Sequence, residues 1–324
     1  MTKSCVVVGL GQIGMNYDYD HIDRSSVFTH VNAIDKHPKF RLVGAVDLSC
    51  KQRNRFEKRY NLPTFDDPEF AVRELQPDVV VIATPTEFHK STLIKVIKAS
   101  RPKIILCEKP LAYELDVAKS MVEMCKKAGI ELFVNYMRRV DDGVLEIKKR
   151  IDNGEIKTPI KANVWYSKGI FNNGSHFLNL LDLWLGNIKS TSIINQGRLL
   201  NNFDPEPDFK VEFNYGTAIF CAAWEESFSH YSIELLSRSG RLLYDEGGNY
   251  IQWQATSDDP NFSGYKILDK NKEIINNSMD IYQWQVYDHI HKYLTDKKTT
   301  LCTGLQALKT LKGIDLIIKQ RQEK

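Results

Sequence analysis

Short apolar runs alternate with amphipathic, charged segments along the first third of the chain. The runs contain many β-branched residues and are continuous, as in strands that are buried on both faces of a parallel sheet. The intervening segments show the spacing of apolar residues that is typical of helices, with lysine-rich ends. This alternation predicts a doubly wound α/β fold. The predicted strands cover residues 5–10, 41–47, 78–84, 103–108 and 132–136.

The pattern changes after about residue 125. Longer stretches follow in which polar and apolar residues alternate and Gly or Asn stands at the turns, which favours a mostly antiparallel sheet. Helical patterns return at 278–294 and 304–320. We therefore predict two domains: an NAD-binding Rossmann domain over 1–124, and an α+β domain with a large open-faced sheet over 125–324, for substrate binding and oligomerisation. A chain of 324 residues exceeds the usual size of one core, which also favours two domains.

Composition and charge narrow the class of protein. The net charge of +3 comes from 44 basic and 41 acidic residues that are well mixed, so a nucleic-acid partner is not expected. No apolar stretch is long enough to span a bilayer, and the N-terminal run is too short for a signal peptide. The six cysteines are widely spaced and contain no CxxC pair, which predicts no structural metal and a reducing, cytoplasmic location.

A GxGxxG motif follows the first predicted strand: Gly9, Gly11 and Gly14, with Gln12 and Ile13 between them. Glycines at these positions let the backbone turn tightly and approach a pyrophosphate at the start of a helix. The motif alone is a weak signal, and an ordinary glycine-rich turn is the alternative. Its place between a strand and an expected helix predicts a dinucleotide site.

An acidic residue closes the second predicted strand. Asp47 is placed to accept hydrogen bonds from the adenosine ribose, and a carboxylate there repels a 2′-phosphate. NAD is therefore favoured over NADP. Arg53 and Arg55 lie nearby in the sequence and keep this preference moderate. The distance from the glycines exceeds the usual spacing because of an insertion over residues 16–30, whose tyrosines and acids we expect to fold over cofactor or substrate.

Further segments complete the pattern: "ATPTEFH" at 83–89, "CEKPLA" at 107–112, "NYMRR" at 135–139 and "NNGSHFLNLLDLWLG" at 172–186. Together with the glycine motif and Asp47, they resemble the Gfo/Idh/MocA oxidoreductases over the whole chain and in the same order. The resemblance implies a Rossmann domain, an open-faced-sheet domain, and NAD(P)-dependent dehydrogenase or reductase activity on CH–OH groups of sugars, sugar derivatives, nucleotide sugars or cyclitols. It also implies a homodimer or homotetramer.

The resemblance assigns cofactor contacts to two segments that directly follow predicted strands, where dinucleotide sites lie. Lys109 is also the expected catalytic lysine, and because it precedes Pro110 its backbone is restricted; a cis bond is possible there. His89 is equally well explained as a polar surface residue. The implied cofactor residues are Thr84, Pro85, Thr86, His89, Glu108 and Lys109.

Many members of this family carry DxGxHxxD, and the histidine is commonly assigned as the base. Here Gly174 and His176 are kept, but Asn172 and Asn179 replace both acids. If a helix begins near Ser175, no local carboxylate supports His176, and the helix N-terminus disfavours imidazolium. We therefore expect Lys109 and His176 to share the hydroxyl proton, since either group can serve as an acid–base catalyst.

The resemblance also implies a set of substrate-binding residues. Their side chains supply hydrogen-bond donors and a stacking face, although packing and surface solvation explain each residue taken singly about as well. These residues are Tyr136, Arg139, Lys168, Asn172 and Asn179.

Two further functions stay open. A sensor that binds NAD and a ligand without catalysis fits the loss of both motif acids, while the retained Lys109 and His176 argue against it. A redox-assisted lyase or epimerase with tightly held NAD is the other alternative, and it predicts product formation without net NADH change.

Overall fold

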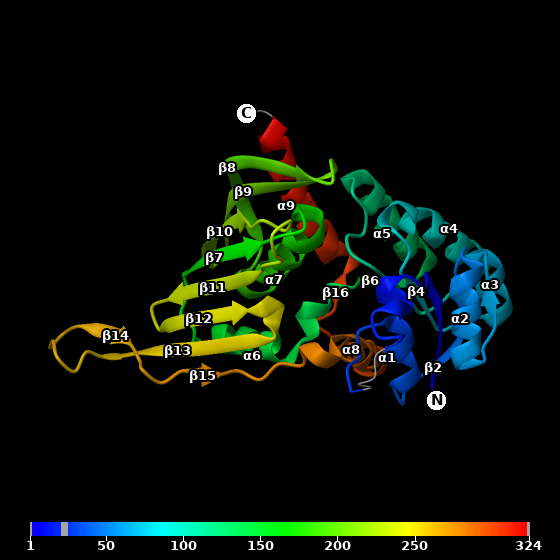
Figure 1. The fold of residues 1–324 in the computed structure, drawn as a ribbon, viewed down its shortest axis with the longest axis horizontal. Helices are drawn as coiled ribbons and strands as arrows, with labels where there is room; N and C mark the ends of the chain where they lie inside the picture. Colours follow the sequence, from blue (N-terminus) through cyan, green and yellow to red (C-terminus); the bar gives the residue numbers. More distant parts are fainter. Residues whose placement is uncertain (1, 21–24, 323–324) are drawn as a thin grey trace. The chain divides into compact units, whose positions relative to one another are not determined.

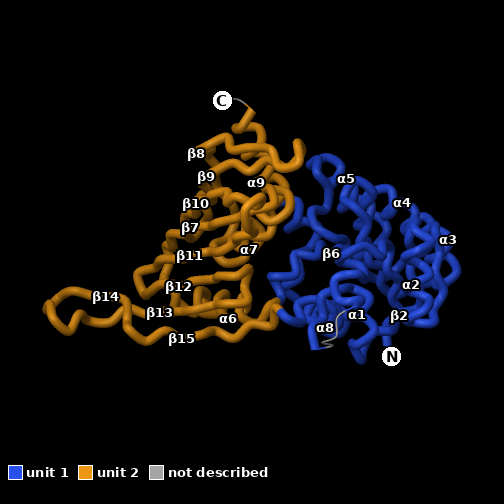
Figure 2. Tube along the Cα trace, in the orientation of Figure 1, with its two compact units in different colours: residues 1–140, 280–309 blue, residues 141–279, 310–324 orange. Residues whose placement is uncertain are grey.

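The structure, a computed structural model, describes residues 2–20 and 25–322. The chain forms two compact units (Figures 1 and 2). Unit 1 comprises Met1–Val140 and Asp280–Lys309, and unit 2 comprises Asp141–Met279 and Thr310–Lys324. This division differs from the predicted boundary between 124 and 125, because the chain leaves unit 1 later and then returns to it. A return of this kind leaves no mark in local sequence patterns.

Unit 1 is built on a sheet in the order β16-β6-β5-β4-β1-β2-β3. The strands from β1 to β6 pair in parallel, and β16 joins β6 in the antiparallel direction. The predicted runs fall within a few residues of the observed strands because each run is apolar on both faces. The bounds are β1 (Lys3–Val8), β2 (Phe40–Val46), β3 (Thr64–Phe65), β4 (Val79–Ile82), β5 (Ile104–Cys107), β6 (Glu131–Val134) and β16 (Cys302–Thr303).

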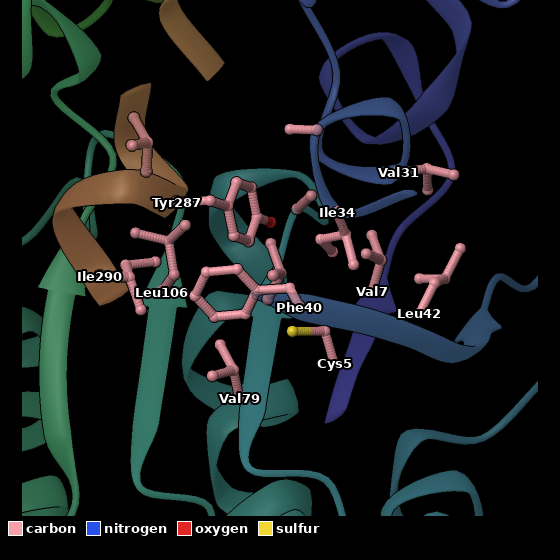
Figure 3. Close-up of a cluster of buried hydrophobic side chains, with 14 of the residues drawn as sticks. Cys5, Val7, Val31, Ile34, Phe40, Leu42, Val79, Leu106, Tyr287 and Ile290 are labelled. Atoms are coloured by element: carbon pink, nitrogen blue, oxygen red, sulfur yellow. The ribbon is translucent and has the colours of Figure 1, made fainter. Parts of the chain in front are cut away.

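Helices cover this sheet on both faces, as right-handed crossovers on either side of β1 require. One face packs against α1, α2 and α8, where Tyr287 and Ile290 of α8 enter a cluster with Phe40 and Leu106 (Figure 3). The helices that follow β3, β4 and β5 belong to the other face. The bounds are α1 (His30–Lys36), α2 (Cys50–Tyr60), α3 (Pro68–Leu75), α4 (His89–Ala99), α5 (Leu115–Ala128) and α8 (Tyr282–Asp296).

Unit 2 holds a sheet in the order β14-β13-β12-β11-β7-β10-β9-β8, with β15 beside β13. The pair β7–β10 is parallel and the others are antiparallel. The bounds are β7 (Ile160–Tyr166), β8 (Ile188–Leu200), β9 (Asp204–Phe213), β10 (Gly216–Ala222), β11 (Ser232–Ser237), β12 (Gly240–Asp245), β13 (Tyr250–Asp258), β14 (Lys266–Leu268) and β15 (Glu273–Ile274).

Residues of β7 alternate strictly between buried and exposed. The buried face meets the helices of this unit, where Trp184 of α7 packs edge-on against Tyr244 at 5.8 Å. The exposed face carries Trp165, so the sheet is open on that side, which confirms the predicted fold class. The helices are α6 (Asp142–Asp152), α7 (Ser175–Leu185) and α9 (Gly304–Gln322), whose first residues belong to unit 1.

Candidate active site

The glycine motif forms the turn at the carboxyl end of β1. Gly9 has φ +103°, and a Cβ there would stand 2.5 Å from the carbonyl oxygen of Ala83. A Cβ on Gly14 would stand 2.0 Å from the carbonyl oxygen of Gly9. Both positions therefore require glycine. A Cβ on Gly11 would meet no atom within 4 Å, so the backbone borders open space at that point.

The helix expected after these glycines is reduced to one π-helical turn, Gln12–Asn16. The amides of Met15 and Asn16 both reach the carbonyl oxygen of Gly11, at 3.0 Å each. A full α-helix begins only at His30, the last residue of the insertion. The expectation of a regular helix directly after the glycines was therefore wrong, because most of the insertion lies between the glycine turn and α1. Gln12 and Ile13 belong to this turn.

Asp47 ties the end of β2 to the glycine turn. One carboxylate oxygen accepts from the amide of Leu10 at 2.7 Å, and the other accepts from the amide of Ser49 at 2.8 Å. The guanidinium of Arg53 donates to the carbonyl oxygens of Asp47 and Leu48, at 2.7 and 3.0 Å. Arg53 is thus held beside the strand end by backbone contacts. The Asp47 side chain borders the pocket described next.

A pocket of about 540 Å³ opens between the ends of β1, β2 and β4. Its walls include Gly9, Gly11, Asp47, Thr84 and Pro85, all of which the sequence assigned to the cofactor. The hydroxyl of Thr84 is buried and has no protein hydrogen-bond partner among the described residues. An orphan hydroxyl, an open glycine and an acceptor carboxylate are what an NAD adenosine and pyrophosphate need, so these residues fit the dinucleotide. Thr86 begins the following turn and does not line this pocket.

His89 occupies the first turn of α4, and its side chain is buried. Its Nε2 lies 2.9 Å from the carbonyl oxygen of Thr84, and its Nδ1 lies 3.2 Å from that of Leu111. Burial lowers the pKa of His89, against the opposite effect of the two carbonyls. Both ring nitrogens therefore face protein. The ring joins the segment after β4 to the segment after β5, and a role along the cofactor stays a prediction.

Glu108 is buried within a hydrogen-bonded cluster of unit 1. Its Oε1 lies 2.8 Å from Nε2 of His30 and accepts from Nδ2 of Asn135 at 2.6 Å. Burial alone would raise the pKa of Glu108, but the bonds from His30 and Asn135 and the charge of Lys109 outweigh it and lower the pKa. Glu108 is therefore an anchor inside the unit. Lys109 follows it directly, and its bond to Pro110 is cis, as the sequence allowed.

Tyr136 and Arg139 come after β6 and are both buried. Arg139 lies in the short turn Met137–Val140, and its Nε donates to the carbonyl oxygen of Thr300 at 3.2 Å. That carbonyl belongs to the segment that returns to unit 1. The structure thus gives Arg139 a packing contact inside the unit, and its binding of substrate stays a prediction.

In unit 2, α7 begins at Ser175, as the sequence predicts, and His176 is buried in its first turn. Asn179 is fully buried, and its Nδ2 donates to the hydroxyl of Thr310 in α9 at 2.8 Å. One of the two amides that replace acids therefore links two helices of unit 2. Asn172 lies in the π-helical turn Ile170–Gly174 that precedes α7.

Two acids that the sequence analysis did not single out hold the segment before α7. Asp204 of β9 accepts from the amides of Phe171 at 3.0 Å and Asn172 at 3.1 Å. Burial raises the pKa of Asp204 to about 6, although these amides act in the opposite direction. Glu206 accepts from the amide of Gly169 at 3.0 Å. The "DPEPDF" pattern, with acids at alternate positions of a strand, was the available signal.

Lys168 has φ +65°, a conformation that non-glycine residues rarely adopt. Its Nζ lies 3.4 Å from one carboxylate oxygen of Glu225, and the other oxygen accepts from the hydroxyl of Ser167 at 2.8 Å. The lysine is thus turned toward an acid of its own unit. Its predicted contact with substrate is not tested by these distances.

The insertion packs mostly on its own unit. The ring of Tyr19 lies under the guanidinium groups of Arg55 and Arg59, at 4.1 and 4.9 Å, and its hydroxyl donates to the carbonyl oxygen of Arg55. Asp18 accepts from the hydroxyl of Thr29 at 2.6 Å. These contacts hold Tyr19 and Asp18 against α1 and α2, and the expected cover over cofactor or substrate stays a prediction. Residues 21–24 lie outside the described part of the chain.

Within residues 2–20 and 25–322, no group of three or more histidine, cysteine, aspartate or glutamate side chains is arranged to hold a metal ion. No described helix combines the length and the apolar character that crossing a membrane requires.

Known proteins resemble this chain in its sequence and in its fold. Residues 3–136 match Gfo/Idh/MocA, described as "Oxidoreductase family, NAD-binding Rossmann fold". The chain is 30% identical over 213 residues to scyllo-inositol 2-dehydrogenase (NAD(+)) of Bacillus subtilis, covering 61% of this chain and 58% of that protein. It is 31% identical over 130 residues to inositol 2-dehydrogenase of Rubrobacter xylanophilus, covering 40% and 37%. The chain thus aligns over roughly half the length of these relatives.

A solved structure extends the likeness to both units. The WlbA dehydrogenase of Bordetella pertussis, in complex with NADH and UDP-GlcNAcA, superposes with a TM-score of 0.76 over 100% of this chain and 97% of that one, at 19% identity. This likeness shows a shared fold. Residues 3–136 thus match the NAD-binding Rossmann fold of the Gfo/Idh/MocA oxidoreductases, and the inositol dehydrogenase relatives agree with this likeness.

Proposed function

We propose that the protein is an NAD(H)-dependent dehydrogenase or reductase that transfers hydride between nicotinamide and a secondary alcohol or ketone. The substrate class is a sugar, sugar derivative, nucleotide sugar or cyclitol. The observation that carries the proposal is the pocket at the ends of β1, β2 and β4, which combines Gly11, Asp47 and the orphan hydroxyl of Thr84.

These pocket residues would hold the cofactor. Gly11 admits the pyrophosphate, and Asp47 accepts from a ribose hydroxyl while repelling a 2′-phosphate, which favours NAD over NADP. Thr84 adds a donor or acceptor that the protein itself does not use. When bound, the nicotinamide accepts or supplies the hydride.

Lys109 and His176 are the residues to which the proposal assigns the hydroxyl proton. Lys109 follows the buried Glu108, so its backbone starts from a fixed point. His176 stands in the first turn of a helix whose end disfavours extra positive charge, so a neutral ring that accepts from a hydroxyl is favoured. Tyr136, Arg139, Lys168 and Asn172 remain proposed substrate contacts.

Polyhydroxylated substrates suit the polar side chains of these segments. The inositol dehydrogenase relatives support a cyclitol, and the nucleotide sugar in the Bordetella structure keeps that class in the experiment. Asn172 supplies a neutral amide where many family members have an acid, which matches a ligand that is rich in hydroxyls.

The test is a screen of inositols, sugars and nucleotide sugars that follows NADH absorbance in both directions. Lys109→Ala is expected to abolish turnover and to leave NADH binding, measured by fluorescence, largely intact. The control is Lys119→Ala, an exposed lysine on α5 that pairs with Asp116. Unchanged turnover of Lys109→Ala would refute the assignment of the lysine.

The same screen separates the alternatives. A protein that binds NADH and a sugar but turns over none would be a sensor, a reading that the amides at 172 and 179 favour. Product that forms without net NADH change, with cofactor that co-purifies, would indicate a lyase or epimerase. Either result would overturn the dehydrogenase proposal.

We further propose that the protein is a homodimer or homotetramer. Trp165, Ile219 and Leu236 lie on one face of neighbouring strands and are 41%, 39% and 46% exposed. Apolar side chains gathered on an open sheet favour a second copy as cover. Light scattering on Trp165→Glu and on the unchanged protein tests this; a monomer in both cases would contradict it.

A further inference from the structure

The cluster around Glu108 contains a histidine to which the proposed reaction gives no role. His30, at the start of α1, is fully buried, and its Nε2 lies 2.8 Å from Oε1 of Glu108. Its Nδ1 lies 2.8 Å from the side-chain nitrogen of Gln283 and 3.0 Å from the hydroxyl of Tyr287. Both partners belong to α8. Three segments far apart in sequence therefore meet at the residue that precedes Lys109.

The hydrogen bonds determine which nitrogen of His30 carries the proton. An ionised carboxylate only accepts, so the amide nitrogen of Asn135 must face Glu108, as it does at 2.6 Å. The same nitrogen also donates to Oε1 of Gln283 at 3.2 Å. The nitrogen of Gln283 consequently faces Nδ1 of His30, which must accept. The ring proton then sits on Nε2 and points at Glu108.

This arrangement fixes the direction of the carboxylate. Oε1 takes both side-chain donors, while Oε2 is turned toward the backbone amide of Lys109, 3.4 Å away. Glu108 cannot rotate without breaking two short bonds in a buried site, where an unpaired acceptor is costly. The peptide from which the Lys109 side chain departs is thereby held in place.

The ring of His30 lies away from solvent. His30 and Tyr287 are both fully buried, and burial raises the pKa of the tyrosine well above its ordinary range. The contact through which His30 can affect the lysine segment is its hydrogen bond to Glu108.

We propose that His30 is a positioning residue for the hydride-transfer reaction: it donates from Nε2 to Glu108, keeps that carboxylate oriented, and so sets the place of Lys109. The inference rests on the proposed function and deepens it. His30 is the last residue of the insertion and the first of α1, so this chain uses the start of α1 to hold the lysine segment.

Several titratable groups lie close enough to Glu108 to interact with its charge. They come from the strand end, from α1, from the start of α4 and from α8: Cys107, Lys109, His30, His89, Tyr282 and Tyr287. Of these, His30 alone contacts the carboxylate through a hydrogen bond that its replacement would remove, with Asn135 as the remaining side-chain donor. When the His30 donor is lost, the burial of Glu108 still favours the protonated form of its carboxyl group and is opposed by one hydrogen bond fewer.

The experiment compares His30→Leu, which removes the donor, with His30→Gln, which keeps an N–H at a similar reach. His37→Leu is the matched control, because His37 is buried in the same unit and its nearest carboxylate oxygen, on Asp288, is 3.9 Å away. We expect kcat of His30→Leu to fall by up to about a hundredfold, as small misplacements of catalytic groups do. KM for NAD should stay within a few-fold of that of the unchanged protein.

The pH profile separates positioning from general damage. In His30→Leu the acid limb of kcat should move to higher pH, because loss of the hydrogen bond from His30 raises the pKa of Glu108. His30→Gln should restore both the limb and most of kcat, and His37→Leu should leave the limb unchanged. A folded His30→Leu with an unmoved limb, or a glutamine variant no better than leucine, would overturn the inference.

A second readout does not depend on turnover. Infrared spectra recorded across a pH series should include a pH at which His30→Leu shows a protonated carboxyl band that is absent from the unchanged protein and from the double variant His30→Leu/Glu108→Gln. If no substrate is turned over, the proposed dehydrogenase fails, yet this band still tests whether His30 lowers the pKa of Glu108. Absence of such a pH for a folded His30→Leu would refute that statement.

Discussion

Replacing Gly14 by alanine tests how the first strand and the glycine turn are joined. The added Cβ would stand 2.0 Å from the carbonyl oxygen of Gly9, a backbone atom that cannot rotate away. Overpacking of this kind costs about 1–3 kcal/mol or more. Since 1 kcal/mol corresponds to about 2–4 °C in domains of 150–250 residues, the melting temperature should fall by about 2–12 °C.

Gly11→Ala is the matched partner of this variant. A Cβ at Gly11 meets nothing within 4 Å, and the residue has φ −69°, so alanine should fit the empty protein with little change in melting temperature. The methyl group would instead occupy the space assigned to the pyrophosphate. We expect NADH to bind at least about tenfold more weakly, a loss of about 1.4 kcal/mol.

Both variants are measured by thermal melting without cofactor and by NADH titration. Gly14→Ala should lose stability and binding together, whereas Gly11→Ala should lose binding alone. A Gly11→Ala protein that binds NADH as tightly as the unchanged one would refute the placement of the pyrophosphate. A Gly14→Ala protein with an unchanged melting temperature would refute the close approach.

Three further variants address charge and packing. Asp47→Ser should raise the affinity for NADPH relative to NADH by about tenfold or more, because the repelling carboxylate is gone; equal ratios in paired titrations would contradict this. Asp204 has a folded pKa of about 6, above its ordinary 3.8, so its contribution to stability is full below pH 4 and is lost as the pH rises through 6. Asp204→Asn should therefore gain on the unchanged protein by up to about 3 kcal/mol between pH 4 and 7 in urea unfolding, and a gain toward low pH would reverse the sign of the argument. Tyr19→Leu should cost about 1–2 kcal/mol of stability through lost cation–π contacts and leave the KM for substrate unchanged. A raised KM would instead indicate that the insertion contacts the substrate.

Local patterns predicted the parallel strands well, since 78–84 and 103–108 are apolar runs that can be buried only in a covered sheet. They also located the start of α7 at Ser175. The short turn after the glycines was not predictable, because hydrophobic spacing does not show where an inserted segment leads the chain. Nor was the return of α8 to unit 1, since its amphipathic pattern suits either unit.

In the candidate site too, motifs predicted some residues and missed others. Motif positions identified the pocket residues Gly11, Asp47 and Thr84, because each follows a strand that the sequence already marks. The cluster at Glu108 could not be predicted, because Asn135 and Gln283 are 148 positions apart and no single motif contains both residues. Asp204 was missed for a similar reason: its partners are backbone amides of a distant turn.

The return of α8 has a consequence for how the chain is made. Tyr287 and Ile290 complete the core against Phe40 and Leu106, so the first unit lacks part of its interior until residues 280–309 have left the ribosome. At about 5–20 residues per second, the stretch from residue 140 to residue 280 takes roughly 7–28 s to synthesise. For that period the nascent Rossmann segment exposes apolar surface that a chaperone could cover. A fragment that ends at residue 140 should accordingly aggregate, and adding residues 280–309 as a separate peptide should rescue its solubility.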